Sequence, residues 1–295
     1  MLSLHTNAAS LSAQNSISQT QKSLSTSMTR LSTGYRINSA MDDAAGLQIA
    51  TRLKAQSSGM AVAMRNTQNS ISMLQTAEGA LNEVGNILVR MKDLATQAAD
   101  GSSSTEDQTA MQGEFDQLTS ELSNIMANTK FGGSALLQNA TTSKLGATAG
   151  VTFQIGADSA EKMVGNFSTE LTAAHTNIIA AATQYNGSAG TAAATAGTEI
   201  NATNANGTIG KLSTAINSVS ALRSKLGAVA NRLDHVYNNL SNVSTNTANA
   251  TGRIMDVDFA TESSNMTSKQ MLMQASTAML KQTNSMSSMV MSLLQ

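Results

Sequence analysis

Residues 212–243, LSTAINSVSALRSKLGAVANRLDHVYNNLSNV, contain the clearest structural pattern of the chain. Apolar residues recur there every seven positions, in two columns three residues apart: Leu212, Val219, Leu226, Leu233 and Leu240, and Ala215, Leu222, Val229, Val236 and Val243. This sustained a/d spacing predicts a long helix that packs along a partner helix. We expect Leu226 and Leu233 in the core of that contact.

A segment with the same spacing lies upstream. Its two columns are Leu74, Leu81, Leu88 and Ala95, and Ala77, Val84, Met91 and Ala98. We expect a helix over about 43–99, with Leu81 and Leu88 in its core, that ends at the glycine of 100–102. A capping box of Ser103 and Glu106 should then open a third helix that ends before Phe131.

The composition excludes several classes of function. The chain has 295 residues, a net charge of -1, no cysteine and no proline. The charge provides no electrostatic attraction for nucleic acid, and a chain without cysteine has neither disulfides nor thiolate chemistry. Because proline costs about 3 kcal/mol inside a helix, its absence fits long unbroken helices.

We expect no catalytic, metal or cofactor site, and therefore no enzyme. His5, His175 and His235 are dispersed along the sequence, so we expect them at the surface rather than as converging ligands. No apolar run approaches the ~18 residues of a membrane span. The first 21 residues carry no charge, unlike a secretory signal peptide, so any export should use another route.

The region after the third helix is different. Val151, Phe153 and Ile155 alternate with polar residues, which predicts a strand of a β-hairpin. Residues 189–206 are mostly Ala, Thr, Gly and Asn, so we expect an exposed or weakly ordered loop.

Both ends of the chain read as amphipathic helices with wide apolar faces. The apolar residues that we expect to mediate assembly are Leu11, Leu24 and Leu31 near the start, and Phe259, Met266, Met273, Leu280 and Leu294 near the end. One side of each helix can pack against the other helix, and the remaining side requires other molecules. The predicted fold class is mainly α: a long coiled-coil helical bundle with a small β-hairpin region and paired terminal helices.

Several motifs resemble bacterial flagellin: residues 30–46 (RLSTGYRINSAMDDAAG), 76–83 (TAEGALNE), 226–233 (LGAVANRL) and 256–262 (DVDFATE). They occur in the order and at the spacing of that family, and the likeness covers roughly residues 1–157 and 210–295. The resemblance implies a structural subunit of the extracellular flagellar filament, a helical homopolymer. It implies a terminal coiled-coil domain (1–43 and 255–295) lining an inner tube, a core helical bundle (44–140 and 208–254), and a β-hairpin with a short variable surface insert (141–207).

The resemblance also implies particular contacts. Arg90, Leu94 and Gln97, with Glu114 on the neighbouring helix, match a surface used between protofilaments and recognised in many flagellins by a host innate immune receptor. Further implied partners are an export chaperone on the C-terminal helix, the type III export gate through which the chain passes unfolded, and the filament cap and hook-junction proteins.

Two other functions remain open at this stage. A hook–filament junction protein resembles flagellin loosely at its termini, although such proteins usually lack this full set of motifs. A membrane-active translocator could use the methionine-rich C-terminal face, but Lys269 and Lys281 are its only basic residues, whereas interfacial helices are usually rich in Lys and Arg.

Overall fold

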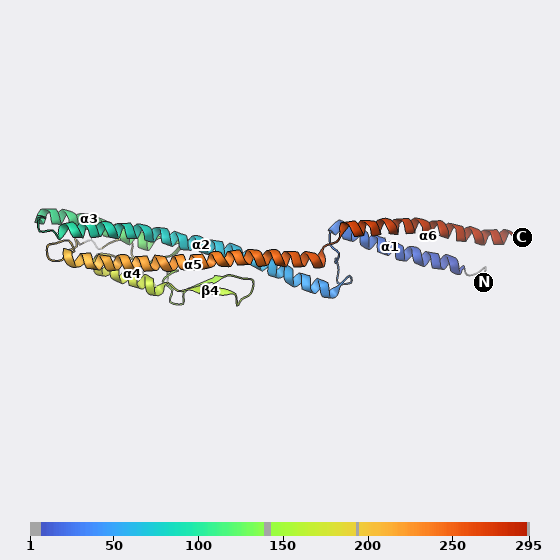
Figure 1. Ribbon diagram of the computed structural model, residues 1–295, viewed down its shortest axis with the longest axis horizontal. Coiled ribbons are helices and arrows are strands. Elements are labelled where there is room, and N and C mark those ends of the chain that lie inside the picture. The colour runs from blue at the N-terminus through green and yellow to red at the C-terminus, as the bar shows by residue number, and fades with distance from the viewer. Residues whose placement is uncertain (1–6, 139–142, 193–194, 294–295) are drawn as a thin grey trace. The chain divides into compact units, whose positions relative to one another are not determined.

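The computed structural model describes residues 7–138, 143–192 and 195–293, with side chains up to residue 285. In chain order the elements are α1 (Ala8–Thr33), α2 (Ala44–Ala98), α3 (Thr105–Asn128), β1 (Lys130–Phe131), β2 (Ser134–Ala135), β3 (Val151–Gln154), β4 (Lys162–Gly165), α4 (Ser168–Ala181), α5 (Ala205–Met255) and α6 (Phe259–Leu293) (Figure 1). The fold class expected from the sequence is confirmed: the chain is mainly helical, with small antiparallel strand pairs.

The described residues form two compact units, which we treat separately. The terminal unit comprises the residues up to Ser57 and those from Thr245 onward, and the central unit comprises Ser58–Ser244. Both domain boundaries expected from the sequence, at 43 and 255, lie inside the terminal unit.

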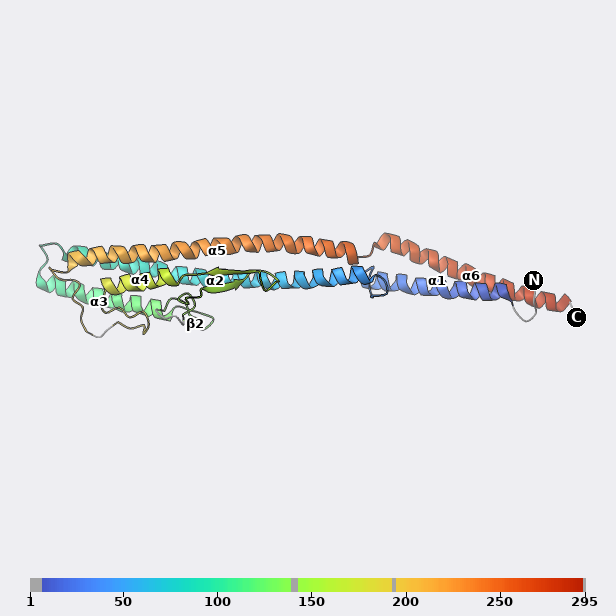
Figure 2. The same cartoon turned by 90° about the horizontal axis from the view of Figure 1, so that it is seen from below.

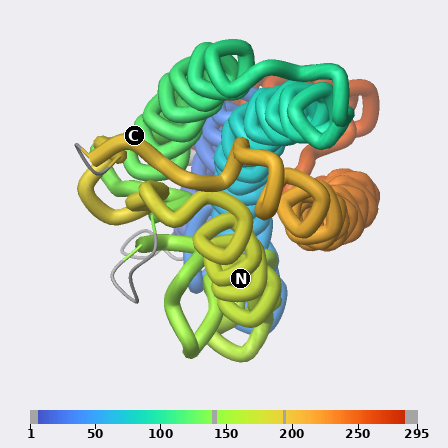
Figure 3. The backbone as a smooth tube through the Cα atoms, turned by 90° about the vertical axis from the view of Figure 1, so that its left-hand side faces the viewer, coloured from blue at the N-terminus to red at the C-terminus, as the bar shows by residue number. Residues whose placement is uncertain are grey.

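The core of the central unit lies between α2 and α5, which run side by side there (Figures 1 and 2). Leu81, Leu88, Leu226 and Leu233 are all buried. Helices α3 and α4 add Phe115, Leu122, Leu171 and Ile178 to the same cluster, and Figure 3 shows the helices of this unit end-on around it. At the far end of the heptad pattern Leu240 is still buried, whereas Val243 is exposed.

Two ion pairs fix neighbouring helices of this unit. Arg223 of α5 lies 2.7 Å from Glu78 of α2, and Lys225 of α5 lies 2.6 Å from Glu170 of α4. Burial opposes ionisation of Glu170, but the hydrogen bond from Lys225 holds its pKa below the ordinary value. These pairs therefore fix α5 relative to its neighbours on two sides.

Two hairpins follow α3. Strands β1 and β2 are joined by Gly132 and Gly133, whose positive φ angles of 55° and 80° suit glycine. Strands β3 and β4 pair antiparallel with Phe153 opposite Met163, so the strand expected at Val151 and Phe153 is present. The β3–β4 loop approaches α2 so closely that a Cβ on Gly59 would lie 2.6 Å from the Cβ of Ala157.

The structure corrects the start of the third helix and confirms the end of the second. The capping box that opens α3 consists of Ser104 and Asp107, one residue later than Ser103 and Glu106, because Ser104 has the extended backbone of an N-cap and its hydroxyl accepts the Asp107 N–H. Helix α2 ends at Ala98, although Gly101 does not adopt the positive φ of a glycine cap. The loop is closed instead by the Ser103 hydroxyl, which donates to the carbonyl of Gln97 at 3.0 Å.

The region 140–210 is more ordered than its composition predicts. It contains α4, a helix not expected from the sequence, which buries Leu171, Ala174 and Ile178. Within the loop expected to be exposed, Glu199, Ile200 and Ala205 are buried. His175, expected at the surface, is 1% exposed, whereas His235 is exposed and His5 lies outside the described residues.

Candidate functional site

The loop that follows α1 and the loop that precedes α6 are hydrogen-bonded to each other in the terminal unit, and they bring the end of α1 and the start of α6 together. Helix α1 ends at Gly34, whose φ of 76° forms a left-handed cap. The Val257 N–H then donates to the Gly34 carbonyl at 3.0 Å, and the Arg36 N–H donates to the Met255 carbonyl at 2.6 Å. These bonds fix the start of α6 beside the end of α1.

Asp258 caps the first turn of α6. Its carboxylate accepts the Thr261 hydroxyl at 2.7 Å and the Ala260 N–H at 3.0 Å. The Thr261 hydroxyl and the backbone N–H groups of Thr261 and Ala260 lower the pKa of Asp258, because they stabilise its charged form. Local hydrogen bonds therefore fix where α6 begins.

Helices α1 and α6 pack against each other along one side. On α1, Leu24 and Ser27 are buried. On α6, the half-buried residues follow spacings of three and four: Met266, Lys269, Met273, Ser276, Leu280 and Thr283. Arg30 lies 3.9 Å from Glu262 across the contact, so an ion pair joins the end of α1 to the first turn of α6 along a seam that mixes apolar and polar side chains.

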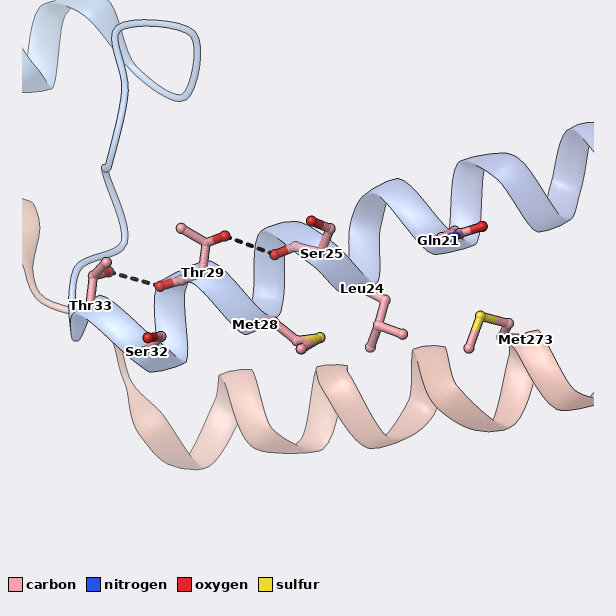
Figure 4. Close-up of a pocket in the computed structure, with 8 residues that line it drawn as sticks. All are labelled: Gln21, Leu24, Ser25, Met28, Thr29, Ser32, Thr33 and Met273. Atoms are coloured by element: carbon pink, nitrogen blue, oxygen red, sulfur yellow. Dashed lines mark hydrogen bonds between the residues drawn. The ribbon is translucent and has the colours of Figure 1, made fainter.

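The same pair leaves several large apolar side chains in contact with water, and we call this set of residues the exposed apolar face. Its large residues are 48% to 66% exposed: Leu11, Met28, Phe259, Met271, Leu272 and Met279. A groove of about 520 Å³ opens between the two helices. Figure 4 shows Leu24 and Met28 of α1 and Met273 of α6 pointing toward one another in it.

The terminal residues expected to mediate assembly therefore fall into distinct environments. Leu24 is buried, Leu31, Met266, Met273 and Leu280 are half-buried, and Leu11 and Phe259 are exposed. Leu294 lies outside the described residues. Met271 was not among the residues expected from the sequence, although it is exposed on the side of α6 opposite Met273.

A second surface lies on α2 and α3 of the central unit. Arg90 and Glu114 form an ion pair, with one guanidinium nitrogen 2.7 Å from the carboxylate, and both side chains are about half exposed. Gln97 is also exposed. Leu94 is only 2% exposed and belongs to the core, so its expected place on this surface is wrong. It is buried because α2 is covered by more than one helix, and its buried stripe is wider than a two-helix seam.

A buried carboxylate ties the loop after α4 to α3. Glu199 accepts the backbone N–H groups of Thr183 and Thr198, both at 2.8 Å, and the side-chain amide of Gln112 at 3.2 Å. Burial alone would raise the pKa of Glu199, but hydrogen bonds from the Thr183 hydroxyl and from the backbone N–H groups of Thr183 and Thr198 hold it below its ordinary value. No cation is needed to keep this carboxylate ionised inside the unit.

His175 forms a second buried polar group. Its Nε2 donates to the Leu137 carbonyl at 2.8 Å, since a carbonyl only accepts, and its Nδ1 therefore accepts from the Tyr185 hydroxyl at 2.6 Å. Burial lowers the pKa of His175. Gly187 lies against this pair, because a Cβ there would come within 2.6 Å of His175 Cε1. The arrangement holds the loop on α4.

Within the described part of the chain, no three His, Asp or Glu residues gather as metal ligands would. In that same part, no helix is both long and apolar enough to cross a membrane. Long paired helices with a half-exposed apolar face, and polar groups that serve only to join segments, define an α-helical structural protein.

The chain belongs to the bacterial flagellin family, a family of structural proteins and not of enzymes. The model of the bacterial flagellin N-terminal helical region matches residues 4–142, and that of the C-terminal helical region matches residues 209–294. The first matched region contains α1, α2 and α3, and the second contains most of α5 and the helix α6. The region between the two matches contains β3, β4 and α4.

Two curated relatives illustrate the likeness. Flagellin C of Vibrio cholerae is 46% identical over 165 residues, which cover 56% of this chain and 42% of the relative. Polar flagellin F of Vibrio parahaemolyticus is 50% identical over 160 residues, covering 54% of this chain and 41% of the relative. The match thus spans less than half the length of these relatives.

A solved structure of a putative flagellar hook-associated protein from Vibrio parahaemolyticus is similar in fold. Its TM-score is 0.52 at 14% identity, and the match covers 73% of this chain and all of that one. At this identity the likeness concerns the fold alone.

Proposed function

We propose that this chain is the structural subunit that polymerises into the bacterial flagellar filament, the extracellular propeller of motility. The observation that carries the proposal is the exposed apolar face of the α1–α6 pair, in a chain of the flagellin family. Leaving this many large apolar side chains of α1 and α6 in water is unfavourable, and a partner that covers them removes that cost.

The energetics favour association through this face. Burying a large apolar side chain fully is worth roughly 1.5–3 kcal/mol. Association itself costs about 4–15 kcal/mol. Burying the exposed halves of these six side chains therefore contributes a free energy comparable with the lower end of that cost. Further contacts from other surfaces would make a polymer stable, while a single contact between two subunits stays weak. This is the behaviour expected of a subunit that is soluble alone and stable only within a lattice.

The proposed arrangement follows the two helical regions. The terminal helices (1–43 and 255–295) line an inner tube, the bundle segments 44–140 and 208–254 form its outer wall, and residues 141–207 face outward. Arg90, Gln97 and Glu114 then contact the neighbouring protofilament. In the free subunit the same three residues are accessible to a host innate immune receptor.

Export and tip assembly follow from the same surface. We infer that the chain passes unfolded through the type III export gate and folds at the tip, under the filament cap and beyond the hook-junction proteins. An export chaperone would cover α6 beforehand, because Met271, Leu272 and Met279 would otherwise promote premature association.

The test is polymerisation of the purified full chain after seeding or salting out, followed by sedimentation and electron microscopy. The wild type should pellet as tubes. The double variant Leu272→Ser/Met279→Ser should remain folded by circular dichroism yet stay in the supernatant. Val164→Ser is the matched control, because it removes an equally exposed apolar side chain from β4 and should still pellet.

Other outcomes would favour other functions. Short caps or rings instead of tubes would favour a hook-junction protein. Leakage of anionic liposomes without any polymer would favour a membrane-active translocator.

A further inference from the structure

We propose that Met28, Met271 and Met279 are three oxidation-sensitive positions of the α1–α6 pair: peroxide oxidises their thioethers in the free subunit and thereby blocks polymerisation, whereas assembly shields them. This inference rests on the proposed function, because it assigns a chemical control to the same exposed apolar face.

Solvent access distinguishes the most exposed methionines of α1 and α6 from those of the core. The chain contains 18 methionines. Met28, Met271 and Met279 are 55%, 60% and 66% exposed. Five others lie in the core of the central unit at no more than 9% exposure: Met60, Met73, Met91, Met126 and Met163. Because oxidation follows solvent access, the first group should react well before the second.

The position of the exposed methionines makes their oxidation consequential. Met28 lines the groove between α1 and α6, beside Leu24 and Met273 (Figure 4). Met279 follows Leu272 by one heptad, so both lie on the same exposed column of α6. Oxidation therefore adds polar groups within the face that we propose is buried between subunits.

The reaction needs only a hydroperoxide as co-reactant. A sulfur lone pair attacks one peroxide oxygen and forms the S–O bond while the O–O bond breaks. The departing hydroxide takes a proton and leaves as water. Sulfur is oxidised by two electrons and the peroxide is reduced by two. A sulfoxide reductase can reverse the change.

The consequence follows from the polarity of the product. A sulfoxide oxygen is a strong acceptor, and burying it without a donor carries a desolvation cost. We expect the critical concentration for polymerisation to rise by about tenfold or more, which corresponds to about 1.4 kcal/mol per subunit. Leucine in place of methionine keeps a similar volume and cannot be oxidised.

The experiment treats soluble full-length protein with hydrogen peroxide, quenches it with catalase, maps sulfoxides by peptide mass spectrometry, and measures the pelleted fraction. Each protein is compared with its own untreated sample. The triple variant M28L/M271L/M279L should keep its pelleted fraction after peroxide, whereas the wild type should lose it. M41L is the matched control, because Met41 is 97% exposed but lies in the loop between α1 and α2; this variant should remain as sensitive as the wild type.

Three results would overturn the inference. The first is a wild type that is oxidised at all three methionines and polymerises normally. The second is a triple variant as sensitive as the wild type. The third is equal oxidation rates of these methionines in monomer and polymer, with circular dichroism showing intact helices. A protein that forms no polymer before any treatment would contradict the proposed function itself.

Discussion

At the scale of single residues, His175 couples the fold of the central unit to pH. Its neutral ring is held by the Leu137 carbonyl and the Tyr185 hydroxyl, and burial keeps its pKa below the ordinary value of 6.5. In the unfolded chain the ring titrates near that ordinary value. Below pH 6.5 the unfolded state therefore binds a proton that the folded state does not, so acid favours unfolding.

We expect the melting temperature of the wild type to fall as the pH is lowered from about 7.5 to about 5.5. His175→Gln should flatten this dependence whatever its own stability, because it removes the titrating ring. His235→Gln, at an exposed position, should retain the wild-type slope. Thermal melts followed by circular dichroism at several pH values measure both slopes; equal slopes for His175→Gln and the wild type would contradict this assignment.

The sequence did not predict the burial of two single residues, His175 and Glu199. The dispersal of the three histidines along the sequence predicts a surface position for His175, yet Leu171, Ala174 and Ile178 form the buried stripe of α4 around it at helical spacing. A search for that spacing in an Ala-rich and Asn-rich segment could have found α4. The burial of Glu199 could not be found in this way, because it depends on Gln112, which is distant in the sequence.

At the scale of elements, the heptad columns and the absence of proline predicted the long helices well. Helix α2 runs for 55 residues close to its expected limits of 43–99, and α5 runs for 51 residues and extends beyond its heptad columns at both ends. The ends were less predictable, since the cap at Ser104 depends on which of three consecutive serines adopts an extended backbone. The β1–β2 hairpin was not predicted either, because its strands are only two residues long.

Two glycines of α2 should respond oppositely to alanine. At Gly79 nothing lies within 4 Å of an added Cβ, so Gly79→Ala should stabilise the helix by about 0.5–1 kcal/mol. At Gly59 the new Cβ would meet the Cβ and Cα of Ala157 at 2.6 and 3.1 Å, so the β3–β4 loop must move. Chemical denaturation should show a gain for Gly79→Ala and a loss for Gly59→Ala. Equal gains would mean that the loop does not contact α2.

The seam of α5 makes a second prediction at this scale. Leu226→Asp places an unpaired charge in the core and should unfold the central unit, since such burial costs several kcal/mol. Val243→Asp continues the same heptad pattern at an exposed position and should change stability by less than about 0.5 kcal/mol. A normal melting curve for Leu226→Asp would refute the seam assignment.

At the scale of the whole molecule, the two compact units differ in how they are stabilised. Buried seams and the Glu199 and His175 hydrogen bonds stabilise the central unit without a partner. The terminal unit buries only one side of α1 and α6 and leaves the exposed apolar face to other molecules. Wide apolar stripes at both ends of the sequence predicted this asymmetry. They could not distinguish half-buried Met273 from exposed Met279, because that depends on how α6 is rotated against α1.

Our proposal for the whole molecule is that the exposed apolar face of α1 and α6 joins copies of this chain in a filament. Electron microscopy with helical reconstruction of the polymer is the decisive measurement. We expect a tube in which Leu272 and Met279 are buried against neighbouring subunits. A tube in which both side chains face solvent, or a chain that stays monomeric under all polymerising conditions, would contradict the proposal.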